Sequence, residues 1–348
     1  MIKNKIKNAL KSIENYLFNN QEYGFWIDFT ACHGGSTCWT TSYVGRHLAE
    51  NPKNLERLSF IKDRIKFNQR MDGGWGYNHT AASDADTTAN CILFLLKFPD
   101  TKEAIEAGIE HLLKQHDQKT GGILTYTEND FGQYTKEYGG RGWYSPTVEI
   151  TALATRALIE SGYNGCEIQK SLEFIASKQD SDGSWQPYWW GSREYTMVES
   201  IETLKKFSEY KENIKLALEY LTDKRRKFGW VNDFTEKYSP FYAAISLGVL
   251  LRNDLVEKYG LAERYQINKK FVPRLLEGEI SILIDKQNTD GSFGPEPLFR
   301  IPRPDIIDAS EIKNWTVEIP HKNSIYTDNN RFFTTATVYS TLLKYLEY

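Results

Sequence analysis

Two carboxylates stand two residues apart at the start of an apolar segment, in the run Ser83-Asp84-Ala85-Asp86-Thr87-Thr88-Ala89. Aspartate in the first turn of a helix accepts backbone N–H bonds, so both side chains could serve only as caps. They could also form an acid pair. A carboxyl group with an ordinary pKa of about 4 is ionised at neutral pH, and it stays protonated only when it is buried or lies beside another anion. The elements that position the two residues decide between these roles.

A phrase that ends in Gly and an aromatic residue recurs along the chain. Its clear copies are Gln69–Gly76 (QRMDGGWG), Gln179–Trp185 (QDSDGSW) and Gln287–Gly294 (QNTDGSFG), and weaker copies begin at Gln21, His116 and Lys227. Self-similarity of this kind indicates an array of similar structural units.

The segments on either side of the phrase differ in polarity. Those before it, such as 55–67 and 168–178, carry an apolar stripe opposite charged residues, which is typical of a helix with one face in water. Those after it, such as Thr87–Phe98 (TTANCILFLLKF) and Phe241–Leu251 (FYAAISLGVLL), are apolar nearly all round. A helix of the second kind must be buried on every side.

Outer and inner helices therefore alternate along residues 1–348, which we expect to form one domain. The outer helices are expected near 3–18, 55–68, 102–115, 167–178, 212–223 and 273–286. The inner helices are expected to begin near Thr37, Asp84, Thr147, Tyr195, Phe241 and Thr334. The inner set is fully buried only if the array closes on itself. The sequence thus predicts an all-α fold, a single (α/α)6 barrel of six helical hairpins.

Two connections are much longer than the others, near 121–145 and 295–331. Loops longer than about 12–15 residues are commonly functional. Since both precede inner helices, we expect both at the same end of the barrel, over its mouth.

Composition excludes several classes of protein. The chain is 40% hydrophobic and 26% charged with a mean hydropathy of −0.54, and it has no apolar run long enough to span a bilayer. A formal net charge of −3 argues against nucleic-acid binding. The first segment has the spacing of an amphipathic helix and not of a signal peptide, and the four cysteines show no disulfide framework, so we expect a cytoplasmic protein.

The repeated phrase is similar to the QW motif of squalene–hopene cyclases, oxidosqualene cyclases and class II diterpene cyclases. Residues 83–89 resemble the Asp-x-Asp-Asp-Thr-Ala protonation motif of the same family, which also opens an inner helix. The resemblance of the repeats covers almost the whole chain. It implies an α/α barrel and a reaction in which protonation of an alkene or epoxide starts a cationic cyclisation. It also implies that Asp86 is the acid and Asp84 its partner, with Thr87 and Thr88 shaping the hydrogen bonds around them.

A carbocation must be shielded from water, and aromatic faces stabilise it; the family's cavities use aromatic residues for this purpose. Candidate substrate contacts are the aromatic residues at or just before inner-helix starts: Trp39, Tyr43, Trp143, Tyr144, Trp189, Trp190, Tyr195, Tyr242 and Phe333. His79, five residues before Asp84, is a further candidate because it could hydrogen-bond to the acid pair.

The chain departs from the family pattern in two respects. Thr87 stands where the family has a further Asp, so the hydrogen bonds around the acid must differ. Cyclases of the family also place the active site between two barrels, whereas this chain has room for one. Either the cavity lies inside the single barrel under the long loops, which favours a small substrate, or a second subunit completes it.

No metal or redox cofactor is expected. Cys32-His33-Gly34 resembles the zinc motif of lanthionine cyclases, but no cysteine precedes it, and Cys38 and Cys91 lie on the wrong side in sequence. The Asp-Asp-x-x-Asp magnesium motif of ionising terpene synthases is absent, since the chain has no two adjacent aspartates.

The sequence thus favours a class II terpene cyclase-like enzyme that cyclises a small isoprenoid or related unsaturated substrate. One alternative is a non-catalytic barrel that binds an apolar ligand or partner. Another is a related enzyme that acts on a carrier-bound or peptide intermediate. Contact of the rim with a membrane and pairing into a homodimer are open alternatives for its partners.

Overall fold

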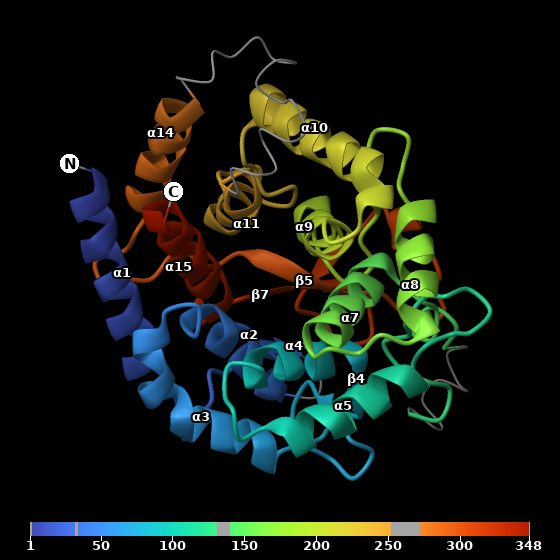
Figure 1. The fold of residues 1–348 in the computed structure, drawn as a ribbon. Helices are drawn as coiled ribbons and strands as arrows, with labels where there is room; N and C mark the ends of the chain where they lie inside the picture. Colours follow the sequence, from blue (N-terminus) through green and yellow to red (C-terminus); the bar gives the residue numbers. More distant parts are fainter. Residues whose placement is uncertain (1, 32–33, 131–139, 252–271, 348) are drawn as a thin grey trace.

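Two concentric rings of helices form the molecule (Figure 1). The computed structural model describes residues 2–31, 34–130, 140–251 and 272–347, which contain twelve α-helices. The outer ring consists of α1 (Ile2–Asn19), α3 (Leu55–Phe67), α5 (Lys102–Lys114), α8 (Cys166–Ser177), α10 (Lys211–Phe228) and α14 (Val272–Ile284). The inner ring consists of α2 (Cys38–Leu48), α4 (Ala85–Leu95), α7 (Val148–Glu160), α9 (Arg193–Leu204), α11 (Pro240–Leu250) and α15 (Phe332–Glu347).

The inner ring is closed. Each inner helix packs against the inner helices that precede and follow it, and α15 packs against α2, so the last hairpin meets the first. The inner helices are buried almost throughout, while the outer helices bury one face. The predicted (α/α)6 barrel is confirmed. None of the described helices is both long and apolar enough to cross a membrane.

The repeated phrase links neighbouring outer helices. The Gln69 Nε2 atom donates to the carbonyl oxygens of Gly73 and Ala104, each at 2.8 Å, which joins the end of α3 to the start of α5. The Trp75 indole N–H donates to the Ile65 carbonyl in the last turn of α3. Gly73 has φ +86°, and a Cβ there would lie 2.3 Å from the Ala107 oxygen. Only glycine fits this turn at low cost.

A threonine on several inner helices fixes the start of the helix to the phrase before it. The Thr88 hydroxyl accepts the Trp75 backbone N–H at 3.0 Å. Thr41, Thr151 and Thr335 do the same for Trp26, Ile123 and Phe293. The two-stranded pair β3 (Trp75–Gly76) and β4 (Ser83–Asp84) adds a second link, with Trp75 opposite Asp84. The phrase therefore determines where each inner helix begins.

The connection 295–331 contains a small sheet rather than an irregular loop. Its strands are β5 (Pro297–Ile301), β6 (Thr316–Val317) and β7 (Ser324–Thr327), in the order β5-β7-β6 with β5 and β7 antiparallel. In Figure 1, β5 and β7 cross the middle of the ring. A second short pair, β1 (Asp28–Ala31) and β2 (Gly34–Ser36), precedes α2, and 3-10 turns lie at Pro52–Asn54, Ser208–Tyr210 and Ala309–Glu311.

The described ends of the other long connection contact this sheet region. The Gly142 N–H donates to the Pro304 oxygen at 2.8 Å, and the Trp143 indole N–H donates to the Pro302 oxygen at 2.9 Å. Residues 131–139 of that connection lie outside the described residues. The described parts of the two long connections thus meet at the end of the barrel where the inner helices begin.

Candidate functional site

A cavity lies at that end of the barrel, between the starts of the inner helices and strand β5. Its volume is only about 30 Å³, far below the roughly 300–1,000 Å³ that is usual for small-molecule sites. Its lining residues come from seven separate parts of the chain: Trp39, Tyr77, Asp84, Asp86, Thr87, Thr125, Tyr126, Ile150, Trp189 and Phe299.

Asp84 is the N-cap of α4. Its Oδ1 atom accepts the Thr87 backbone N–H at 2.7 Å, and its Oδ2 atom accepts the Thr87 hydroxyl at 2.8 Å and the Tyr77 N–H at 3.1 Å. Burial raises the pKa of Asp84 to about 7, against the opposing effect of these hydrogen bonds. Three donated hydrogen bonds suit a carboxylate anion, so Asp84 is the member of the pair that carries the negative charge more readily.

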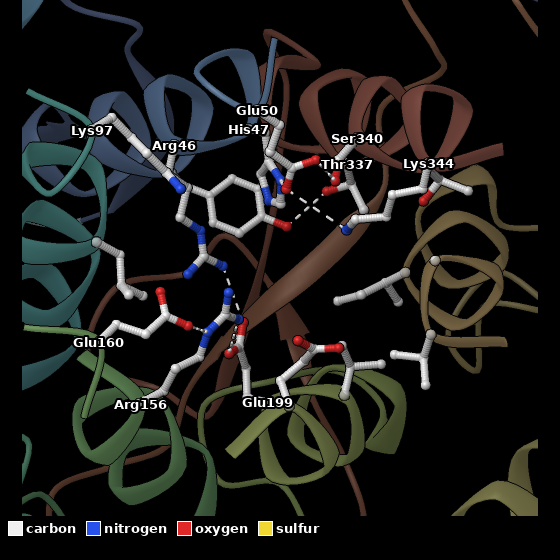
Figure 2. A pocket seen from close by; sticks show the side chains of 18 residues that line it. Arg46, His47, Glu50, Lys97, Arg156, Glu160, Glu199, Thr337, Ser340 and Lys344 are labelled. Atoms are coloured by element: carbon white, nitrogen blue, oxygen red, sulfur yellow. Dashed lines mark hydrogen bonds and ion pairs between the residues drawn. The ribbon is translucent and has the colours of Figure 1, made fainter. Parts of the chain in front are cut away.

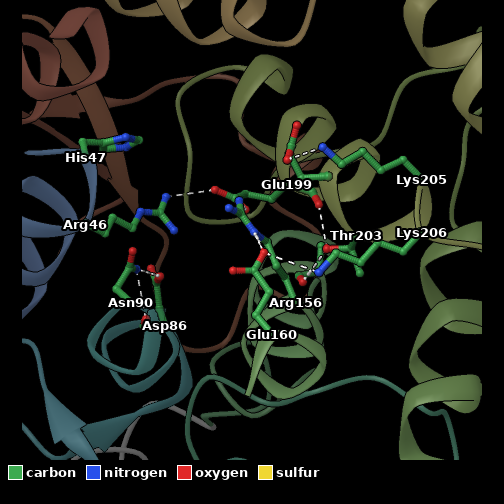
Figure 3. A network of polar contacts seen from close by, with 12 residues as sticks. Arg46, His47, Asp86, Asn90, Arg156, Glu160, Glu199, Thr203, Lys205 and Lys206 are labelled. Atoms are coloured by element: carbon green, nitrogen blue, oxygen red, sulfur yellow. Dashed lines mark hydrogen bonds and ion pairs between the residues drawn. The ribbon is translucent and has the colours of Figure 1, made fainter. Parts of the chain in front are cut away.

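Asp86 lies in the first turn of α4 and is only 7% exposed. Its Oδ1 atom accepts one hydrogen bond, from the Asn90 side-chain amide at 2.9 Å (Figure 3). Burial and the negative charge of Asp84 raise the pKa of Asp86 well above its usual value, while the Trp39 indole and Arg46 oppose the rise. These surroundings favour the protonated form of Asp86.

Two other inner helices carry an acid in the first turn, and both differ from Asp86. Glu149 on α7 accepts the backbone N–H groups of Tyr188 and Trp189 at 2.6 and 2.7 Å. Glu194 on α9 forms an ion pair with Lys224 at 2.7 Å. Among the described residues, no backbone N–H donates to the Asp86 carboxyl and no cation lies within 4 Å of it. Asp86 therefore lacks the backbone donors that Glu149 has and the ion pair that Glu194 has.

Aromatic rings form most of the remaining wall. Phe299 of β5 lies with its ring centroid 5.0 Å from that of Trp39, 6.2 Å from that of Tyr77 and 6.3 Å from that of Trp189. The Trp189 indole N–H is satisfied by the Thr125 hydroxyl at 2.9 Å, which fixes that ring. The cavity thus places π faces around the acid pair, an arrangement that can stabilise positive charge.

The sequence-predicted residues fall into three groups. Asp84, Asp86, Thr87, Trp39 and Trp189 line the cavity together. A second group lies behind its wall. Trp143 lies 5.8 Å from Trp189, Trp190 stacks on Tyr195 at 3.7 Å, and Tyr144, Tyr242 and Phe333 also lie outside the lining.

The third group is placed elsewhere, and for these residues the structure corrects the expectation. His79 is exposed and does not reach the acid pair, because its loop is held by Arg70 through backbone carbonyls. The Thr88 hydroxyl is used by the Trp75 backbone. Tyr43 lies one turn further along α2 than Trp39 and lines a different cavity, with its hydroxyl 2.7 Å from that of Thr337.

Five lining residues were not among the predicted contacts: Tyr77, Thr125, Tyr126, Ile150 and Phe299. Tyr77 follows the repeated phrase directly, and Tyr126 lies in the first long connection, so position in the loops before inner helices is the signal that could have found them. Phe299 also lies in a loop before an inner helix, but its place between Trp39 and Trp189 depends on the path of β5 across the barrel, which the sequence does not show.

A metal centre has no support in the described part of the chain. No group of three His, Cys, Asp or Glu side chains there is placed to hold a metal ion. Cys32 and His33, which carry the resemblance to a zinc motif, lie outside the described residues. Cys38, Cys91 and Cys166 are free thiols.

Comparison with known proteins found one similar curated protein and several solved structures of the same fold, among them an unsaturated glucuronyl hydrolase specific for heparin that is 13% identical over 99% of this chain and 97% of that chain, with a TM-score of 0.62. No protein-family model matches the chain. The drimenyl diphosphate synthase of Streptomyces showdoensis is 22% identical over 285 residues, which make up 79% of this chain and 48% of that protein. The chain thus spans about half the length of this curated relative.

Solved structures share the fold over a greater length. A variant of the type II terpene cyclase MstE from Scytonema, in complex with geranylgeranyl dihydroxybenzoate, is 24% identical over 99% of both chains, with a TM-score of 0.86. The ent-copalyl diphosphate synthase from Streptomyces platensis is 16% identical over 88% of this chain and 50% of that chain, with a TM-score of 0.61. The chain therefore has the α/α barrel fold of terpene cyclases.

Proposed function

We propose that this protein is a protonation-initiated terpene cyclase and that Asp86 is its general acid. The observation that carries the proposal is the state of Asp86: a buried carboxyl beside the anionic Asp84, without a backbone donor or a cation among the described residues, on the wall of an aromatic cavity. A general acid for an alkene must hold its proton at working pH, and such surroundings do this. The similarity to a drimenyl diphosphate synthase and to the type II terpene cyclase MstE supports the same reaction class.

In the proposed reaction the Asp86 carboxyl gives its proton to one carbon of a C=C bond. The π electrons form the new C–H bond, the neighbouring carbon becomes a cation, and Asp86 is left as the carboxylate. A second C=C bond of the same chain attacks the cation and closes a ring. Loss of a proton from the final cation ends the reaction, so the product is an isomer of the substrate.

The aromatic wall has two roles in this proposal. Trp39, Trp189 and Phe299 present π faces that stabilise the migrating positive charge, each by about 0.5–2 kcal/mol. They also exclude water, which would otherwise trap the cation as an alcohol. Side chains nearly fill the cavity, so a substrate enters only if they move, and a short isoprenoid chain requires the least movement.

The test is to incubate the purified protein with linear prenyl substrates of several lengths, with and without a diphosphate, geranylgeranyl dihydroxybenzoate among them. We expect a cyclic product of unchanged mass from at least one of them, detected by mass spectrometry. Asp86→Asn should lower its rate by at least about 10³-fold, because the amide cannot donate a proton to carbon.

Glu296→Gln is the matched control. Glu296 is a buried carboxyl at the same end of the barrel, held by the Phe241 N–H, and it does not line the cavity. This variant should cyclise the substrate at close to the wild-type rate. Equal rates in wild type and a folded Asp86→Asn would refute the role of Asp86. Binding of prenyl substrates without any turnover would favour the non-catalytic alternative.

A further inference from the structure

A second cavity lies at the opposite end of the barrel, where the inner helices end (Figure 2). Its free space is about 720 Å³, including the part that is open to solvent. Unlike the aromatic cavity around Asp86, it is lined largely by charged side chains: Arg46, Glu50, Lys97, Arg156, Glu160, Glu199, Glu202 and Lys344. Nothing in the proposed cyclisation uses these residues.

The carboxylates of this second cavity are already paired. Both oxygens of Glu199 are taken, one by Arg46 Nη2 at 3.0 Å and the other by Arg156 Nη1 at 3.2 Å (Figure 3). Glu160 accepts Arg156 Nε at 2.9 Å and lies 3.5 Å from the Lys206 ammonium.

The remaining two carboxylates are paired as well. Glu202 bonds to Lys205 at 2.7 Å. Glu50 accepts the Ser340 hydroxyl at 2.7 Å and lies 3.7 Å from the Lys344 ammonium. The cavity therefore offers few free acceptors to a ligand.

The cations, in contrast, keep unused donors. Arg46 is only 7% exposed, yet its Nε and Nη1 atoms have no hydrogen-bond acceptor among the described residues. Its guanidinium lies beside that of Arg156 in Figure 2. The Lys97 ammonium makes no hydrogen bond and no ion pair within 4 Å to the described part of the chain. A buried guanidinium with free N–H groups is costly unless something accepts them.

The charges of the lining are balanced. The cavity is lined by four cations, Arg46, Lys97, Arg156 and Lys344, and by four carboxylates, Glu50, Glu160, Glu199 and Glu202. His47 adds no charge at neutral pH, because burial lowers its pKa to about 4. It is therefore the unused donors of Arg46, and not an excess of positive charge, that favour an anionic ligand.

We infer that this second cavity binds a phosphate-type tetrahedral oxyanion, held by Arg46, Arg156 and Lys97. Guanidinium groups pair with oxyanions through several parallel hydrogen bonds. Three donor side chains around one cavity suit a tetrahedral ion with several acceptor oxygens better than a planar carboxylate. The site is separate from the Asp86 cavity, so its existence does not depend on the proposed cyclase activity.

The test is calorimetric titration of the full chain with inorganic phosphate and with acetate, at an ionic strength held constant with potassium chloride. We expect saturable phosphate binding and weaker or no acetate binding. Lys97→Gln should raise the phosphate Kd several-fold, and because Lys97 is exposed this variant should fold normally.

The double variant Arg46→Gln/Glu199→Gln removes the buried guanidinium together with its partner and should abolish saturable binding. Lys119→Gln changes an exposed lysine at the mouth end and should bind as wild type does. The inference is overturned if phosphate does not bind, or if Lys97→Gln and a folded double variant bind it with the wild-type Kd. Acetate binding as tight as phosphate binding would overturn the preference for a tetrahedral ion.

Discussion

Asp84 and Asp86 show how the same side chain takes different roles two residues apart. Asp84 accepts hydrogen bonds from two backbone N–H groups and one hydroxyl, whereas the Asp86 carboxyl accepts its hydrogen bond from an amide side chain. Asp328 repeats the Asp84 arrangement at the last inner helix, since its Oδ2 atom accepts both the N–H and the hydroxyl of Thr334. The capping role of Asp84 thus recurs at α15, whereas Asp86 differs from the first-turn acids Glu149 and Glu194 in having neither a backbone donor nor an ion pair among the described residues.

This contrast predicts a pH effect. If Asp86 must be protonated to react, activity is complete below its raised pKa and is lost as the pH rises through that pKa. Asp84→Asn removes a neighbouring negative charge, so the pKa of Asp86 falls and the loss should begin at lower pH, by about one unit. At pH values above both pKa values, Asp84→Asn should react about tenfold more slowly than wild type, because a pKa lower by one unit leaves about a tenth as much protonated Asp86.

A pH–rate profile of each protein is the measurement. Asp28→Asn provides the control, because Asp28 is a buried carboxyl at the same end that caps Phe332 and does not line the cavity. Its profile should coincide with that of wild type. If Asp84→Asn loses activity at the same pH as wild type, the charge of Asp84 does not affect the pKa of Asp86.

At the scale of elements, strand β5 sets the size of the cavity. It reaches across the barrel from the last repeat, and Phe299 packs between Trp39 and Trp189. Its neighbours Leu298 and Arg300 are buried on the other face of the strand. One side chain of a connecting segment therefore closes a site whose acid pair belongs to α4.

Phe299→Ala should enlarge the cavity and shift selectivity toward longer prenyl chains by several-fold, with more alcohol product because water gains access to the cation. Competition between substrates of two lengths, followed by mass spectrometry, measures the shift. Leu298→Ala removes a similar apolar side chain from the opposite face of β5 and should leave the ratio unchanged. An identical product ratio in Phe299→Ala would mean that β5 does not limit the substrate.

At the scale of the whole molecule, stability depends on closing the ring. The last copy of the phrase makes the closing contact: Gln287 Nε2 donates to the Ala9 oxygen of α1 at 3.2 Å. Gly291 has φ +92°, and a Cβ there would lie 2.3 Å from the Ser12 oxygen. The glycine lets the sixth hairpin approach the first.

Gly291→Ala should therefore destabilise the barrel by roughly 1–3 kcal/mol or more, which lowers the Tm by at least about 2 °C. Gly278→Ala is the matched control. Gly278 lies within α14, and a Cβ there would have no heavy atom within 4 Å, so alanine should raise stability by up to about 1 kcal/mol. The Tm of each variant is measured by calorimetric unfolding. Equal Tm values for Gly291→Ala and Gly278→Ala would contradict the prediction that a Cβ at position 291 clashes with α1.

The sequence by itself determined the features that repeat locally. Polarity distinguishes inner from outer helices, and Gly73, Gly183 and Gln69 mark the turns between them, so the number and order of hairpins and the closed barrel follow. The placement of Asp84 and Asp86 at the start of an inner helix follows in the same way, because it depends only on the helix boundary.

Only the tertiary structure decided which side chains surround that helix start. Neighbouring turns of one helix open into different cavities, so Trp39 lies beside Asp86 while Tyr43 belongs to the opposite end. Phe299 enters from a distant strand, and the free donors of Arg46 become evident only when the partners of Glu199 are known. Periodicity fixes the face of a helix, but contacts between segments far apart in sequence depend on how the ring closes.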